Sequence, residues 1–136
     1  MYTIAILIRI ASIAARKYLD SIGIHTLSRE NYDADIIAFH EKFHEVEVKL
    51  GWEGEWNRVW KDIHIPYRKK RLLEKHRSGW FWIFRRDCKM AWIIPSEQLR
   101  LEYVTEVPNK KIASEELFYC VPVDKAYLIE LGKEVE

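Results

Sequence analysis

The chain has 136 residues, of which 49% are hydrophobic, and a formal net charge of +1. This length and composition suffice for one buried core, so we expect a single domain over residues 1–136 without repeats or linkers. Two cysteines, Cys88 and Cys120, exclude a disulfide framework and indicate a reducing, cytoplasmic (intracellular) location.

The first segment, residues 1–15, is apolar enough for a signal peptide or anchor, but Arg9 interrupts it and no basic segment precedes it. It is also too short to span a bilayer, so we expect a buried helix and no membrane partner. The apolar positions that recur at helical spacing are Ile6, Ile10, Ile13, Ala14 and Leu19. Gly23 is expected to end this helix, and residues 24–27 to begin the first strand.

A β-hairpin is predicted next, formed by residues 33–39 and 44–50. The first run is rich in β-branched residues, and the second alternates polar and apolar side chains. Its apolar face carries Val46, Val48 and Leu50, and its polar face carries Glu45, Glu47 and Lys49. The short connection between the two runs brings Asp35 beside the polar face.

Asp35, Glu47 and Lys49 form the candidate catalytic site. Two carboxylates on adjacent strands make an open site for Mg²⁺ or Mn²⁺, since Mg²⁺ prefers a few carboxylate oxygens and takes further ligands from water and substrate phosphate. We expect Asp35 and Glu47 to bind the metal, with the backbone carbonyl of Val48 as a further ligand. The metal would lower the pKa of a bound water, and Lys49 would position that water or stabilise the transition state of phosphodiester hydrolysis.

An acid that opens a hydrophobic strand (DIIA), followed by Glu-x-Lys in EVEVK, resembles the PD-(D/E)xK nuclease superfamily. Within it, the stretch is most similar to archaeal Holliday junction resolvases. The resemblance implies an α/β fold with a restriction-endonuclease-like αβββαβ core, in which helices flank a mixed central sheet. This core would cover about residues 9–95, with residues 96–136 as a C-terminal extension. It also implies a metal-dependent DNA endonuclease of recombination or repair, acting on DNA as a homodimer.

Two positions depart from the motif. Ala34 stands where the motif has proline, and the first helix carries no glutamate near the site. Glu30 or Asp33 could replace that glutamate. The missing acid supports an alternative function, a catalytically inactive nuclease-fold module that binds nucleic acid or protein.

Positive charge is concentrated in residues 66–94, which hold nine Lys/Arg and two Asp/Glu. This block is expected to meet a phosphate backbone, although such runs also simply keep a helix face solvated. A helix is predicted after Pro66 with Leu72 and Leu73 buried, and a hairpin between strands 80–84 and 90–94. The residues predicted to contact DNA are Arg68, Lys69, Lys70, Arg71, Arg85 and Arg86.

Trp52, Trp56 and Trp60 are four residues apart and would form one stripe on a helix. They are interpreted as an aromatic ridge packed against the sheet or a second subunit, with a stacking surface for unpaired bases as the alternative. The strand at 80–84 is apolar on both faces and is therefore predicted to be central.

The sequence HEKFH at residues 40–44 matches the zinc-protease pattern HExxH literally. That motif requires a helix to place both imidazoles on one side, whereas this match falls in the predicted hairpin, so we favour the nuclease.

Two short elements are predicted in the C-terminal part of the chain. Ser114 is expected to cap a short helix with Glu115 and Glu116 in its first turn, and residues 126–131 to form a late strand or short helix. The tail could complete the sheet, form a dimer contact or recognise substrate.

Overall fold

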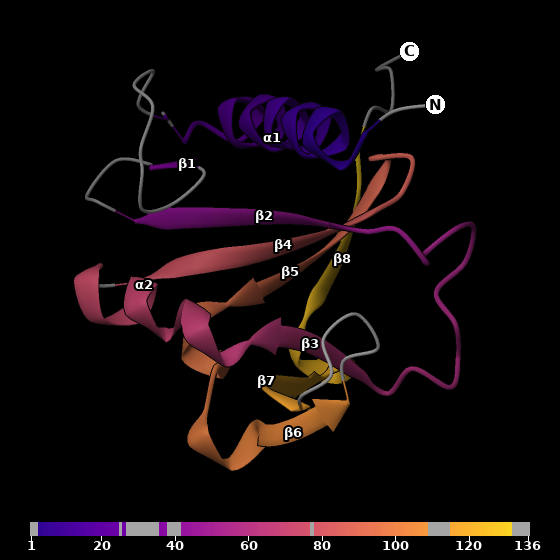
Figure 1. Ribbon diagram of the computed structural model, residues 1–136. Coiled ribbons are helices and arrows are strands. Elements are labelled where there is room, and N and C mark those ends of the chain that lie inside the picture. Colours follow the sequence, from indigo (N-terminus) through magenta and orange to yellow (C-terminus); the bar gives the residue numbers. More distant parts are fainter. Residues whose placement is uncertain are drawn as a thin grey trace.

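The computed structural model describes residues 3–24, 26, 36–37, 42–76, 78–108 and 115–131. Within them the protein is of the mixed α/β class and has three layers (Figure 1). Helix α1 (Ile4–Ser21) covers one face of a five-stranded sheet, and a three-stranded sheet lies against the other face.

The larger sheet has the strand order β1-β2-β4-β5-β8 in the described residues. Its strands are β1 (Ile36–Ile37), β2 (Phe43–Lys49), β4 (Gly79–Arg85), β5 (Met90–Pro95) and β8 (Tyr127–Glu130). Strands β2 and β4 run parallel, whereas the β1–β2, β4–β5 and β5–β8 pairs are antiparallel, which makes the sheet mixed as predicted.

The smaller sheet is antiparallel and was not predicted. It has the order β3-β7-β6, formed by β3 (Asp62–Pro66), β7 (Glu115–Pro122) and β6 (Val104–Pro108). Short helical segments connect the strands: η2 (Tyr67–Lys69), α2 (Lys70–Lys75), η3 (Ser96–Gln98), η4 (Leu101–Tyr103) and η5 (Val123–Lys125). The η2–α2 segment follows Pro66 and buries Leu72, as the sequence predicts.

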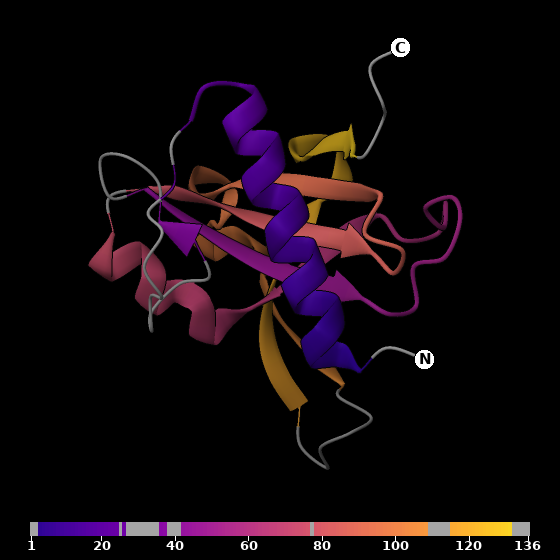
Figure 2. The same ribbon diagram turned by 90° about the horizontal axis from the view of Figure 1, so that it is seen from above.

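Helix α1 crosses the larger sheet obliquely (Figure 2). The hydroxyl of Thr3 caps its start by accepting a hydrogen bond from the Ile6 amide, and Gly23 follows its end with a positive φ of 81°, as predicted. The buried stripe consists of Leu7, Ala11, Ala15 and Leu19. The predicted face was therefore partly wrong, because Ile6 and Ile13 lie beside this stripe and are 43% and 49% exposed. None of the helices in the described part is long and apolar enough to cross a membrane.

Strand β4 is central and contributes to both cores, which confirms the prediction from its apolar faces. Phe81 and Ile83 pack between the two sheets, and Trp82 and Phe84 pack beneath α1. The β4–β5 hairpin is also present where it was predicted.

The predicted C-terminal helix was wrong. Residues Glu115–Pro122 form β7, which pairs with both β3 and β6. The later segment is a strand, β8, that completes the larger sheet beside β5. Pairing on both edges favours the extended conformation of β7 over a short helix with a good N-cap.

Candidate functional site

The predicted hairpin is present in those of its residues that the structure describes. Ile36 pairs with His44 and Ile37 with Phe43 in an antiparallel ladder. Asp35, together with the substitute acids Glu30 and Asp33, lies outside the described residues. Of the predicted catalytic residues, the structure therefore describes Glu47 and Lys49.

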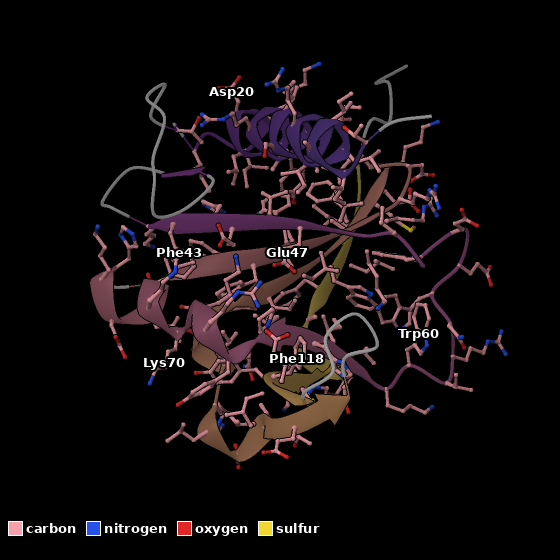
Figure 3. The ribbon with its side chains drawn as sticks, in the orientation of Figure 1. Asp20, Phe43, Glu47, Trp60, Lys70 and Phe118 are labelled. Carbon is pink, nitrogen blue, oxygen red and sulfur yellow. The ribbon has the colours of Figure 1, made fainter. Side chains whose placement is uncertain are left out.

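Strand β2 presents the two faces that its alternating pattern predicts for residues 45–49, whereas Leu50, expected on the apolar face, lies past the end of the strand and is exposed. Val46 and Val48 pack with the residues beneath α1, and Phe43 belongs to the core between the sheets. Glu47 and Lys49 share the face of Phe43 because side chains alternate along a strand. Figure 3 shows the Glu47 side chain pointing away from α1, toward the layer of β3 and β7. The side chain of Val48 thus faces away from the site, and its carbonyl stays a predicted ligand.

A lysine that the motif does not include lies against two acids of this face. The ammonium of Lys69, in η2, is 2.6 Å from Glu45 Oε2 and 3.7 Å from Glu47 Oε1. We call Glu45, Glu47 and Lys69 the carboxylate–lysine cluster. Its members are unequally buried, since the side chain of Glu45 is 5% exposed and that of Glu47 36% exposed.

Electrostatics around Glu47 are dominated by burial, which raises the pKa of its carboxyl group. The Lys69 ammonium opposes this rise, and the neighbouring Glu45 carboxylate adds to it. Arg68 also lowers the pKa of Glu47, which places its positive charge within electrostatic reach of the cluster. A partly desolvated carboxylate beside a second one is a group that gains from a bound cation.

Lys49 lies over an aromatic ring at the end of β2. Its Nζ atom is 4.7 Å from the centroid of the Trp60 ring, a cation–π contact. Partial desolvation lowers the pKa of Lys49. The ammonium therefore has a defined position on the face that it shares with Glu47.

The three tryptophans after β2 pack together, although their segment is not helical. Trp56 makes edge contacts with Trp52 and Trp60 at 5.1 Å and with Trp92 of β5 at 5.8 Å. Its indole N–H donates to the Trp60 carbonyl. Trp52 is 1% exposed. The interpretation as an aromatic ridge packed against the sheet is thereby confirmed for Trp56, and Trp52 is buried against Trp56.

The basic residues of the predicted run at η2 and α2 have different environments. Arg68 pairs with Glu116 of β7 at 2.6 Å, and Lys69 turns inward to the cluster. Lys70 lies 4.9 Å from the centroid of the Tyr67 ring, and Arg71 is exposed. DNA contact by these residues stays a prediction.

The hairpin arginines hold the loop after β2. Arg85 pairs with Asp87 at 2.9 Å and donates to the carbonyl of Gly54, and Arg86 pairs with Glu53 at 3.4 Å. Both guanidinium groups therefore have partners in the chain, and their predicted contact with DNA is untested.

The HExxH match contains a strand residue. His44 lies in β2, where it is 2% exposed, and its Nδ1 accepts a hydrogen bond from the Trp82 indole at 2.9 Å. It also stacks on Trp80. Residues 40 and 41 lie outside the described part. A strand at position 44 lacks the helical geometry that the zinc-protease motif requires, which supports the hairpin interpretation.

Burial and the charge of Lys42 lower the pKa of His44 to about 4. The unfolded chain therefore binds the proton more tightly, and stability is lost as the pH falls below about 6.5. We expect the free energy of unfolding to fall by about 2 kcal/mol between pH 7 and pH 5 through this residue. Urea titrations of the wild type and His44→Phe at both pH values measure it. An equal pH dependence in the two proteins would contradict the assignment.

The described residues do not by themselves complete a metal centre. Among them, His, Cys, Asp and Glu side chains do not gather in threes into a group that could hold a metal ion. Glu45 and Glu47 supply two carboxylates, which fit a hard cation in chemistry but need a further ligand. In comparisons with known proteins, no family model, curated protein or solved structure matches the chain.

Proposed function

We propose that the chain is a metal-dependent DNA endonuclease with a restriction-endonuclease-like core. One observation carries the proposal: Glu47 and Lys49 share a face of β2, which pairs as a hairpin with the strand that begins directly after Asp35. The order of α1, β1, β2, α2 and β4, with β2 parallel to β4, agrees with part of the αβββαβ core. The strand expected at residues 24–27, which would be the first of that core, lies partly outside the described residues. Strand β3 belongs to the second sheet and is an addition to that arrangement.

In this proposal Asp35 and Glu47 hold Mg²⁺ or Mn²⁺, with the Val48 carbonyl as a further ligand. A bound ion supplies a water of lowered pKa and neutralises charge on the phosphate. Lys49 contributes a cation on the same face, where it orients the attacking water or stabilises the pentavalent transition state. The reaction is direct hydrolysis, without a covalent intermediate.

The proposed DNA surface is the basic run at η2 and α2, because it borders the cluster. Lys69 contacts Glu47, and the charge of Arg68 acts on the same carboxylate. A phosphate backbone that approaches Glu47 would therefore meet positive charge at once. A homodimer would suit a two-fold DNA substrate.

The test is a cleavage assay with Mg²⁺ or Mn²⁺ on four-way junction, flap, single-stranded and duplex DNA. We expect wild-type protein to cut at least one of these and Glu47→Ala to cut none, because that variant loses a metal ligand. Glu97→Ala, which removes an exposed acid from η3, is the matched control and should cut like the wild type. Equal cleavage by Glu47→Ala and the wild type would overturn the proposal.

A second candidate is a binding module without catalysis. It is favoured by the Lys69 ammonium, which already lies between the two carboxylates of the cluster and offsets part of their charge. Retention of DNA in a gel shift without cleavage of any substrate would favour this candidate.

A further inference from the structure

Lys69 is held unequally by the two acids of the carboxylate–lysine cluster. Its distance of 2.6 Å to Glu45 is that of a charge-assisted hydrogen bond, whereas 3.7 Å to Glu47 is too long for one. Its side chain is 15% exposed, so the ammonium is largely withdrawn from water. Glu45 is therefore the anchor of Lys69, and Glu47 is an electrostatic neighbour.

The carboxylate that lies closer to Lys69 is also the more deeply buried of the two. Glu45 is 5% exposed, and a buried carboxylate needs a permanent partner. Glu47 is 36% exposed and can exchange one cation for another through its solvent-facing side. A cation that arrives from solvent thus meets Glu47 first and competes there with Lys69.

We propose that Lys69 is a positioning residue that serves as the resident counter-ion of Glu47. In the absence of a divalent cation it neutralises Glu47, and when one binds it leaves Glu47 but stays attached to Glu45. Glu45 thereby keeps the ammonium beside the position where a phosphate would bind. This inference rests on the proposed function, because it takes Glu47 as a metal ligand.

The expected consequence is that Lys69 weakens metal binding. An opposite charge within about 4–6 Å changes the protonation equilibrium of a carboxylate by tenfold or more, and a competing metal should experience a similar effect. Lys69→Met removes the charge and keeps the unbranched stem. Lys69→Gln also removes it but can still donate to Glu45, so it serves if the methionine variant does not fold.

The experiment measures Mn²⁺ affinity of the whole chain from the electron paramagnetic resonance signal of free Mn²⁺. We expect Lys69→Met or Lys69→Gln to tighten binding about tenfold or more, and a further Glu47→Gln change to abolish that gain. Lys17→Met is the matched control. Lys17 is an exposed lysine of α1, on the opposite side of the larger sheet, so its removal should change affinity less than about twofold.

The outcomes separate this inference from the proposed function. Equal Mn²⁺ affinity in the wild type and the Lys69 variants overturns the inference. If Glu47→Gln nevertheless loses the Mn²⁺ binding that the wild type shows, the nuclease proposal still stands. Binding that is detected only after Lys69 is replaced supports the inference and favours the non-catalytic candidate for the wild type. Absence of binding in every variant overturns both.

Discussion

Replacement of Lys49 by alanine is expected to slow metal-dependent DNA cleavage by roughly 10²–10³-fold, the usual cost of removing one group that stabilises a charged transition state. Lys49 lies on the face of Glu47 at the end of β2, and its ammonium is held over the Trp60 ring. Its removal forfeits an exposed cation–π contact worth about 0.5–1 kcal/mol, so the fold should persist. Single-turnover cleavage at saturating metal measures the rate, and thermal unfolding checks the fold.

Lys17→Ala is the matched control for this variant. Lys17 is an exposed lysine of α1, on the opposite side of the larger sheet, and its loss should leave the rate unchanged. A gel shift should show similar DNA affinity for both variants, because the predicted DNA surface lies at η2 and α2. Undiminished cleavage by Lys49→Ala would refute its catalytic role.

Gly79→Ala is expected to destabilise the fold by about 3 kcal/mol or more, through overpacking in a core that cannot expand. Gly79 begins β4 and pairs with Phe43 of β2 in the parallel ladder. A Cβ atom at position 79 would lie 2.5 Å from two ring atoms of Phe43 and closer still to its carbonyl oxygen. Phe43 is fully buried between the sheets, so relief would require the backbones of β2 and β4 to separate.

Urea unfolding at pH 7 measures this change, with Gly51→Ala as the matched control. The nearest atom to a Cβ at position 51 is Trp60 Cη2 at 4.0 Å, an ordinary contact. The control should therefore remain within about 0.5 kcal/mol of the wild type. Similar unfolding midpoints for the two variants would show that β2 and β4 can separate without a large loss of stability.

Local sequence patterns predicted the elements whose burial follows directly from the order of polar and apolar residues along the chain. Strand β2 has its two faces where the alternation of Val46 and Glu47 puts them, and β4 is central because both of its faces are apolar. Gly23 ends α1 because its positive φ is unfavourable for other residues. In α1 itself the pattern was ambiguous, since apolar residues occur on several sides and the sequence could not select Leu7 over Ile6.

The rest depends on contacts between distant residues. Lys69 belongs to a basic run that reads as a solvated helix face, and its inward position follows from where β3 ends. Glu115 and Glu116 read as a helix start, but they pair with Pro108 and Val107 of β6. The rest of their strand, from Phe118 to Pro122, pairs with β3, which is distant in sequence. The aromatic contacts of Trp56 likewise depend on Trp92, which lies on another strand. Local propensity carries no information about such partners.

The smaller sheet also governs the order in which the molecule can assemble. Strand β3 lies in the connection between β2 and β4, but its residue Asp62 pairs with Pro122, 60 positions later. The loop closure that this pairing requires makes the sheet a slow, late step of folding. Because η2 follows β3 and Arg68 pairs with Glu116 of β7, docking of β7 adds a second restraint to the segment that carries Lys69, besides its contact with Glu45. A nascent chain that has not yet produced β7 would therefore display the Glu47–Lys49 motif beside a counter-ion that Glu45 alone restrains.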